Sequence, residues 1–250
     1  MISTKLFTQN KEKINHEQSI KVLEEGQVLF FPEHHFSSFE SSLMTPNILD
    51  GKHKNVGYDY KKKKLGGYAK NSGVEKILEK TMRSYAEFAF QLIQVTLPHY
   101  VPNLQWGRTS FRPAEINGRE ISKRKDDTRL HVDSFASSPV NGRRILRVFC
   151  NINPNNEPRV WNLGESFTEI LEHFASQVPP FSAFKAKLLQ WVKGTKTLRS
   201  PYDHYMLHLH DMMKLDDRYQ QEVEKTLIKF PSLSTWIVFT DQVSHAALSG

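Results

Sequence analysis

The chain has 250 residues, of which 38% are hydrophobic, so it is long enough for one large domain with a buried core. Its single cysteine excludes an internal disulfide and predicts a reducing compartment, and no apolar run approaches the ~20 residues that span a bilayer. The formal net charge of +7 predicts an anionic partner: a nucleic acid, a phosphorylated or carboxylated sugar, or an acidic membrane surface. The mixed, polar start of the chain does not resemble a signal peptide, and we expect a cytoplasmic protein.

The first 104 residues are expected to form a mainly helical part that packs on a sheet. The apolar pattern of residues 15–25 predicts a short helix, and the apolar run at residues 28–31 predicts a strand. Residues 73–97 predict a long helix, because their apolar positions recur at helical spacing. We assign this helix to the scaffold and no chemistry to it.

Residues 47–70 are the least regular part of the chain, since their glycines argue against regular structure. This segment carries Lys52, Lys54, Lys61, Lys62, Lys63, Lys64 and Lys70, with Tyr58, Tyr60 and Tyr68 between them. Basic side chains interleaved with aromatic rings suit phosphates or sugars, whereas a solvated, mobile loop is the alternative. A flexible lid would combine the two.

Residues 105–250 are expected to form a β core with a helical insertion at about residues 164–230. Short strands are predicted at residues 105–111, 144–154, 158–162 and 235–239, with turns at 116–119 and 141–142 and helices at 164–174, 182–192 and 216–229. Alternation within residues 144–154 places Ile145, Arg147 and Phe149 on one face. The chain as a whole, residues 1–250, is then a single α+β domain with a mainly β core.

The segment 130–135 places a histidine and a carboxylate two residues apart, His131 and Asp133. In extended backbone these side chains point to the same face and can reach one metal ion. His245, just past the strand predicted at residues 235–239, is the best candidate for a third ligand. Two histidines and one carboxylate form the facial triad of non-haem Fe(II) oxygenases. A lone His-x-Asp pair also occurs by chance in many proteins, so the triad depends on the rest of the chain.

His208 and His210 form a second close pair and a rival for the metal. In a strand both side chains could bind one ion, whereas in a helix they point apart. We favour a role facing the substrate or supporting the ligands over metal ligation. A polar surface segment is the remaining alternative.

Together, the His-x-Asp pair and the distant histidine resemble the Fe(II)/2-oxoglutarate dioxygenase superfamily, which is built on a double-stranded β-helix, the cupin-like jelly roll. A closer resemblance is to the hydroxylases of Kdo, 3-deoxy-D-manno-oct-2-ulosonic acid. It is carried by Thr128-Arg129-Leu130-His131-Val132-Asp133-Ser134-Phe135, by Asn151-Ile152-Asn153-Pro154 and by Asp241-Gln242-Val243-Ser244-His245-Ala246. It covers most of the chain from about Gln105 onward.

This resemblance implies a dioxygenase that uses Fe(II), O₂ and the cosubstrate 2-oxoglutarate, and releases succinate and CO₂. Its substrate would be the lipid-linked Kdo of a lipid A precursor in Gram-negative bacteria, hydroxylated at carbon 3 to the sugar Ko. The enzyme would act in the cytoplasm, with peripheral contact to the inner membrane, and would have no nucleic-acid partner.

The cosubstrate's distal carboxylate requires a permanently charged donor, which an arginine supplies. Many superfamily members carry this donor about ten positions after the distal histidine, but only five residues follow His245. Either the chain is shortened or the anchor comes from elsewhere, and Arg144 is one of four arginines available. Arg147 is our first choice, since it lies within a core strand, and Arg112 and Arg129 follow. Arg129 shares the alternation of His131 and Asp133.

The anionic substrate would be bound by the lysine-rich segment 52–70, by His208 and His210, and by Lys123 and Arg124. Three alternatives remain open at this point. A jelly-roll protein that binds anionic carbohydrate without catalysis would not need the three ligands. An oxygenase acting on protein or nucleic acid would share them. A nucleic-acid-binding module is the weakest alternative, because the basic residues are scattered and form no recognised motif.

Overall fold

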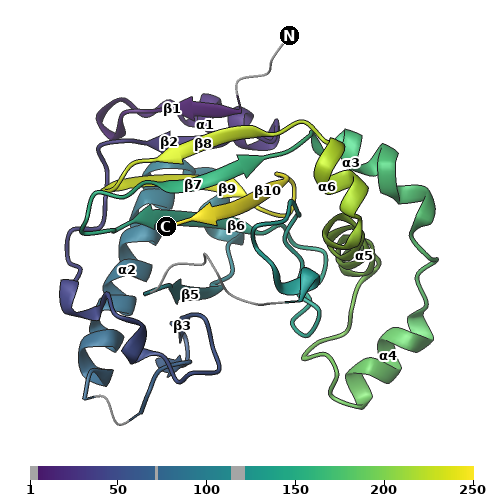
Figure 1. Cartoon of the computed structure of the whole chain (residues 1–250), viewed down its shortest axis with the longest axis horizontal. Helices are drawn as coiled ribbons and strands as arrows, with labels where there is room; N and C mark the ends of the chain where they lie inside the picture. Colours follow the sequence, from purple (N-terminus) through teal and green to yellow (C-terminus); the bar gives the residue numbers. More distant parts are fainter. Residues whose placement is uncertain (1–4, 71–72, 114–121) are drawn as a thin grey trace.

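Two facing β-sheets form the centre of the computed structural model, which describes residues 5–70, 73–113 and 122–250 (Figure 1). The turn predicted at residues 116–119 lies outside the described residues. The first sheet has the order β1-β2-β9-β6 and the second has the order β10-β7-β8. The strands of the first are β1 Leu6–Thr8, β2 Val28–Phe31, β9 Ser234–Phe239 and β6 Leu146–Asn151; those of the second are β10 His245–Ser249, β7 Arg159–Leu163 and β8 Thr226–Phe230.

The two sheets face each other across an aromatic core. Trp236 of β9 stacks on Phe230 of β8 with ring centroids 4.0 Å apart, and Trp161 of β7 meets Trp236 edge-on at 5.6 Å. Phe149 of β6 packs against both tryptophans. Alternate residues of each strand point into this core, which confirms the face predicted for Phe149.

Helices cover the outer face of the first sheet, so its central strands are apolar on both sides. Helix α1, His16–Glu24, and the long helix α2, Glu75–Thr96, pack against β2 and β9. Both helices are found where the sequence predicts them. The first 104 residues also supply β1 and β2 to the main sheet, in addition to the helices expected there.

A third, smaller sheet packs against α2 and corrects the expectation for residues 47–70. Strands β3, Val56–Asp59, and β4, Lys64–Gly66, pair as a hairpin, and β3 also pairs with β5, Arg108–Phe111. The prediction of an irregular loop was therefore wrong for residues 56–66. Tyr58, which the sequence offered as a ligand for sugars, is fully buried in the hydrophobic core under α2.

Four helices lie between β7 and β8 along the chain and stand to the right of the sheets in Figure 1. They are α3 Phe167–Phe174, α4 Ala183–Trp191, α5 Pro201–Leu215 and α6 Asp217–Glu222. The helix predicted at residues 216–229 is wrong in its second half, which is strand β8. In β8 the residues Thr226, Ile228 and Phe230 alternate with the exposed Leu227 and Lys229, and this period of two outweighs helix propensity.

Among the described residues, no helix is long and apolar enough to cross a membrane. Cys150, on β6, has no disulfide partner, and burial raises the pKa of its thiol, as expected for an unreactive side chain.

Candidate metal centre

His131 and His245 are joined by a short antiparallel bridge at the edge of the second sheet. The His131 amide donates to the His245 carbonyl at 3.0 Å, and the His245 amide donates to the His131 carbonyl at 2.9 Å. Asp133 is held separately, because its amide donates to the Thr240 carbonyl at 2.7 Å. The main chain alone thus brings together residues that lie far apart in the sequence.

Both imidazoles are oriented by the carbonyl two residues before them. The His131 Nδ1 lies 2.8 Å from the Arg129 carbonyl, and the His245 Nδ1 lies 2.8 Å from the Val243 carbonyl. A carbonyl oxygen only accepts, so each Nδ1 carries the proton and each Nε2 keeps its lone pair for a metal. Outer hydrogen bonds of this kind are typical of metal-binding histidines.

One ligand atom from each of His131, Asp133 and His245 lies within 4.8 Å of the others. Both histidines are buried and Asp133 is half-buried, and Trp161 stacks on the His245 ring at 5.1 Å between centroids. Two imidazole nitrogens and one carboxylate oxygen are the donor set that suits Fe(II) in oxygenases. The arrangement fits a divalent metal and supplies protein ligands on one face of it.

The protonation states also suit a metal. Burial lowers the pKa of both His131 and His245, so both rings are neutral at physiological pH. Burial alone would raise the pKa of Asp133, but the charge of Arg147 and a hydrogen bond from Thr240 bring it below its ordinary value. Neutral imidazoles and an ionised carboxylate are the forms that bind a cation.

Arg147, the first choice for the cosubstrate, lies in this centre. Its Nε is 2.8 Å from the Asp133 Oδ2 and 3.2 Å from the Thr240 Oγ1, and its guanidinium lies over the Phe135 ring. It therefore sits beside a predicted metal ligand, on the side of β6 that faces the second sheet.

A group of cations surrounds Asp127 next to the histidines. The Asp127 carboxylate lies 2.5 Å from the Lys54 Nζ, 3.1 Å from the Arg112 Nη2 and 3.7 Å from the Lys214 Nζ. Arg159 of β7 adds a fourth cation, and burial together with Arg112 lowers its pKa to about 10. We refer to Lys54, Arg112, Arg159 and Lys214 as the cation cluster.

Arg159 was missed from the sequence. It is two residues before Trp161 on the same face of β7, and no side-chain carboxylate in the described part of the chain forms an ion pair with it. Its guanidinium donates to the Gly250 main-chain oxygen. The sequence did contain a signal for Arg159: it shares a face of its strand with Trp161 and Leu163, which are core residues, and a charged side chain on such a face needs a partner.

The side chains of Arg129 and Arg144 bind partners outside the metal centre. Arg129 donates to the Lys214 carbonyl at 2.6 Å and to the Asp217 Oδ1 at 2.6 Å, so its guanidinium is directed to α5 and α6. Its alternation with His131 did not place it in the same cavity, because the backbone around it is a turn and not a regular strand. Arg144 pairs with Asp241 at 2.6 Å.

The second histidine pair lies in helix α5, so His208 and His210 point apart and form no chelate. The His210 ring lies 5.5 Å from the His131 ring, beside the metal centre, and its Nδ1 is 3.0 Å from Asp211. The His208 ring instead packs against His204 at 4.5 Å. Only His210 can therefore support the centre directly.

Lys123 and Arg124 lie in the 3₁₀ helix η5, Lys123–Lys125, which packs against α5. Lys123 pairs with Asp217 at 2.5 Å and Arg124 pairs with Asp211 at 3.3 Å. Their role in substrate binding stays a prediction.

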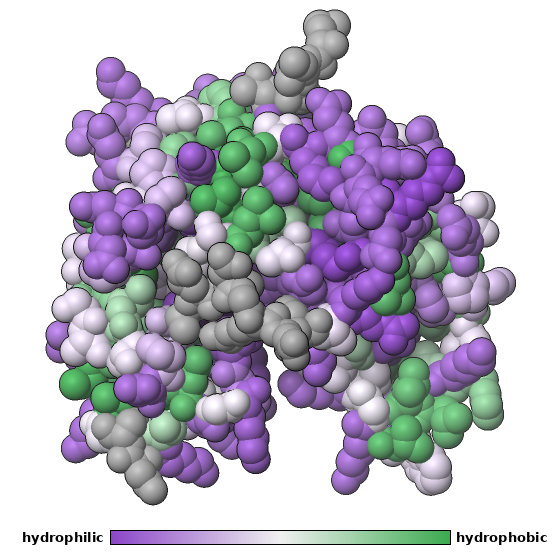
Figure 2. Space-filling model, viewed as in Figure 1, coloured by the Kyte–Doolittle hydropathy of each residue, from purple (hydrophilic) through white to green (hydrophobic). Residues whose placement is uncertain are grey.

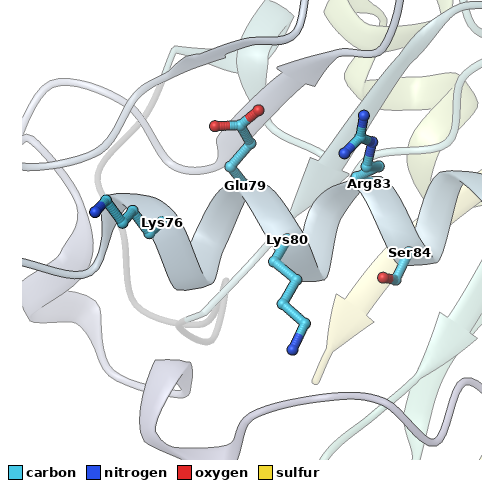
Figure 3. Close-up of a pocket in the computed structure, with 5 residues that line it drawn as sticks. All are labelled: Lys76, Glu79, Lys80, Arg83 and Ser84. Carbon is cyan, nitrogen blue, oxygen red and sulfur yellow. The ribbon is translucent and has the colours of Figure 1, made fainter.

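A depression on α2 does not have the arrangement of side chains that a functional site needs. Lys76, Glu79, Lys80, Arg83 and Ser84 line it, all from one helix, and Figure 3 shows Glu79 and Arg83 on the side opposite to Lys80 and Ser84. These side chains do not converge on a point. The depression therefore lacks the convergence that His131, Asp133 and His245 have.

Comparison with known proteins agrees with this geometry. The family model of 3-deoxy-D-manno-oct-2-ulosonic acid (Kdo) hydroxylase matches residues 7–250. The cobalt(II) complex of the Kdo hydroxylase KdoO, a non-heme Fe(II) alpha-ketoglutarate-dependent dioxygenase, is 43% identical with a TM-score of 0.93, covering 99% of this chain and 86% of that chain. KdoO with alpha-ketoglutarate (2-oxoglutarate) and Fe(III) is 42% identical with a TM-score of 0.91, covering 98% and 85%. No curated protein sequence matches the chain. The chain therefore belongs to the Kdo hydroxylase family.

Proposed function

We propose that this protein is an Fe(II)- and 2-oxoglutarate-dependent dioxygenase that hydroxylates Kdo. The observation that carries this proposal is the convergence of His131, Asp133 and His245, each held in its ligating form by its own surroundings. Three protein ligands on one face leave the opposite face for a chelating cosubstrate and O₂. The chemistry that Fe(II) supplies there is the insertion of one oxygen atom of O₂ into a C–H bond, while 2-oxoglutarate becomes succinate and CO₂.

The chain's own residues provide binding sites for the cosubstrate. A dicarboxylate needs cations next to the metal, and Arg147 and the cation cluster are the candidates. Asp127 contacts Lys54, Arg112 and Lys214, whereas Arg159 forms no ion pair with a side-chain carboxylate among the described residues. We assign the distal carboxylate of 2-oxoglutarate to Arg159 and Arg112, and to Arg147 a role between the cosubstrate and Asp133.

His210 has a positioning role in this proposal. Its ring meets His131 edge-on, and Asp211 holds its Nδ1. The ring therefore closes one wall of the centre and limits water there, which protects a reactive site from side reactions.

The finer substrate assignment is lipid-linked Kdo in a lipid A precursor, hydroxylated at carbon 3 to Ko at the cytoplasmic face of the inner membrane. The net charge of +7 supports an anionic glycolipid, because such a substrate carries carboxylate and phosphate groups. The resemblance to Kdo hydroxylases supports the sugar itself.

The test is turnover of a Kdo-bearing lipid A precursor with Fe(II), 2-oxoglutarate and O₂. We expect the sugar to gain one oxygen atom, with one succinate formed per sugar, and we expect Asp133→Ala to abolish both. Asp217→Ala is a matched control, because it removes an exposed carboxylate paired with Arg129 and Lys123. Oxygen insertion that persists in Asp133→Ala would refute the metal centre. A rate of succinate formation that is the same with and without the Kdo substrate would refute the proposed substrate.

A further inference from the structure

Helix α4 carries an apolar stripe that faces away from the protein. Phe184, Leu188 and Trp191 follow one another at helical spacing, and their exposed fractions are 76%, 45% and 80%. Ala186, on the opposite side of the helix, is 3% exposed and is the contact with the body of the protein. A surface helix normally buries its apolar stripe, so this orientation is reversed.

The stripe extends into a larger surface. Leu189, Val192 and Leu198 are also exposed, at 37%, 55% and 42%. We call these six residues the α4 patch: Phe184, Leu188, Leu189, Trp191, Val192 and Leu198. Figure 2 shows apolar residues gathered at the lower right of the molecule, where Figure 1 places α4. Large apolar side chains gathered on a surface mark an interaction site.

The charge around the patch has one sign. Residues 182–200 contain Lys185, Lys187, Lys193, Lys196 and Arg199, and no aspartate or glutamate. The four lysines are exposed, and Lys185 and Lys187 lie on either side of the apolar stripe. Tryptophan and phenylalanine flanked by lysines is the composition of helices that lie in the interface of an anionic bilayer.

The patch is fixed to the loop that follows the metal ligands. The Lys196 amide donates to the Ser137 carbonyl at 3.0 Å, and the Arg199 guanidinium donates to the Ala136 carbonyl at 2.7 Å. The Asn141 side-chain amide donates to the Leu198 carbonyl at 2.6 Å. A surface that binds through α4 is therefore held at a set position relative to Asp133.

We propose that the α4 patch docks the protein on an anionic lipid bilayer, with Phe184 and Trp191 in the headgroup region and the lysines on the phosphates. This deepens the proposed function, on whose lipid-linked substrate it rests. The patch is a protruding tip beside the hollow at the lower edge of Figure 2, and it has no acidic residue to pair with a basic partner. A flat, negatively charged surface fits both properties better than a protein groove does.

The test is binding of the whole protein to vesicles, measured by co-sedimentation and by the blue shift of tryptophan fluorescence. We expect binding to vesicles of phosphatidylethanolamine with phosphatidylglycerol and much weaker binding to phosphatidylcholine alone. The double variant Phe184→Ser, Trp191→Ser should weaken binding roughly tenfold or more, since two large side chains no longer leave water. Leu227→Ser, on the exposed side of β8 and 53% exposed, is the matched control.

The charge requirement has its own variant pair. Lys185→Glu, Lys187→Glu should weaken binding to the anionic vesicles by about tenfold or more, whereas Lys76→Glu, Lys80→Glu on α2 should leave it within about twofold, because those lysines (Figure 3) lie outside the patch. Equal losses from both pairs would overturn the assignment to α4. A dimer in solution that the Phe184, Trp191 variant dissociates, with no vesicle binding by the wild type, would also overturn it.

Turnover of a soluble Kdo glycoside separates the two proposals. The α4 variants should process the soluble glycoside like the wild type and lose activity only on glycolipid in vesicles. Wild-type protein that binds vesicles but does not hydroxylate Kdo would refute the proposed function and leave the docking surface intact. If the wild-type protein hydroxylates Kdo but does not bind vesicles, only the docking surface is refuted.

Discussion

At the scale of single residues, the metal centre depends on which nitrogen of each histidine is free. The Arg129 and Val243 carbonyls fix the proton on Nδ1 in both rings, so both Nε2 atoms are available to bind a metal. A preformed donor set reduces the ordering cost of binding. The proximity of His131 and Asp133 could be predicted from the sequence, because their two-residue spacing places both side chains on one face.

The arginines proposed to bind the cosubstrate were harder to predict, because their environment is built from segments distant in sequence. Arg112 follows β5, Arg147 lies on β6 and Arg159 lies on β7, and of these the sequence singled out Arg147 by its place in a core strand. Arg129 shares the alternation of His131 and Asp133, yet its side chain binds the Lys214 carbonyl and Asp217. The partners of a charged side chain depend on tertiary contacts, and the alternation of residues along a strand does not predict those contacts.

Arg159→Gln should raise the KM for 2-oxoglutarate by roughly tenfold to a hundredfold, the value of a lost charge-assisted hydrogen bond. Cobalt(II) affinity should stay within about twofold, since Arg159 is no metal ligand. Initial rates against 2-oxoglutarate and a cobalt titration measure the two effects. Arg129→Gln is the control and should leave this KM unchanged. An unchanged KM in Arg159→Gln, with the protein folded, would remove Arg159 from the cosubstrate site.

At the scale of elements, one glycine lies between the segments that carry the two histidines. Gly164 follows β7, and its amide donates to the Ser244 carbonyl at 2.9 Å. A Cβ built on Gly164 would lie 2.4 Å from the Ser244 Oγ and 3.0 Å from the Leu130 Cδ1. Ser244 and Leu130 each precede a histidine of the candidate metal centre, so a side chain at position 164 would push both segments.

Gly164→Ala should therefore weaken cobalt(II) binding and lower the free energy of unfolding by about 1–3 kcal/mol, the usual cost of overpacking. Gly107→Ala is a matched control, because no atom lies within 4 Å of a Cβ at that position. Cobalt titration and denaturant unfolding measure the two effects. If Gly164→Ala binds cobalt like the wild type, the contact with Ser244 relaxes without moving the histidines.

Elements were predicted well where the period was long and unmixed. Helix α2 has six turns of apolar spacing, and the sequence predicts it almost to its ends. Strand β8 was taken for helix because residues 216–229 join a real short helix, α6, to a strand after a brief link. The β3–β4 hairpin was taken for loop because its glycines and lysines hide a strand whose buried positions are only Val56 and Tyr58.

At the scale of the whole molecule, Asp127 ties together parts that are far apart in sequence. Lys54 precedes β3, Arg112 follows β5, and Lys214 belongs to α5, and all three contact its carboxylate. The Asp127 main-chain carbonyl also accepts from the Ala247 amide of β10 at 2.7 Å. The helical insertion, the small sheet and the second main sheet therefore meet at this residue, beside the metal centre.

The cation cluster makes this junction sensitive to acid. Burial by itself raises the pKa of Asp127, but the hydrogen bond and charge of Lys54, with Arg112 and Lys214, bring the pKa below its ordinary value. A carboxyl whose folded pKa is depressed adds stability above its unfolded pKa, about 3.9, and loses it as the pH falls toward the folded value. The contribution of Asp127 is thus complete at neutral pH and fades below about pH 4.

Asp127→Asn should lower the free energy of unfolding by about 3 kcal/mol at pH 7, near the lower end for breaking a largely buried ion pair. The difference from wild type should shrink as the pH is lowered through about 4, because the carboxyl of the unfolded wild-type chain then takes up a proton while the folded carboxyl, with its depressed pKa, stays ionised, and this favours the unfolded state. Urea unfolding from pH 7 down to pH 3 measures this difference. Asp216→Asn, at the N-cap of α6, is the control, since its loss should be smaller and unrelated to the cluster. A difference for Asp127→Asn that stays constant over this range would mean that packing, and not charge, holds the three parts together.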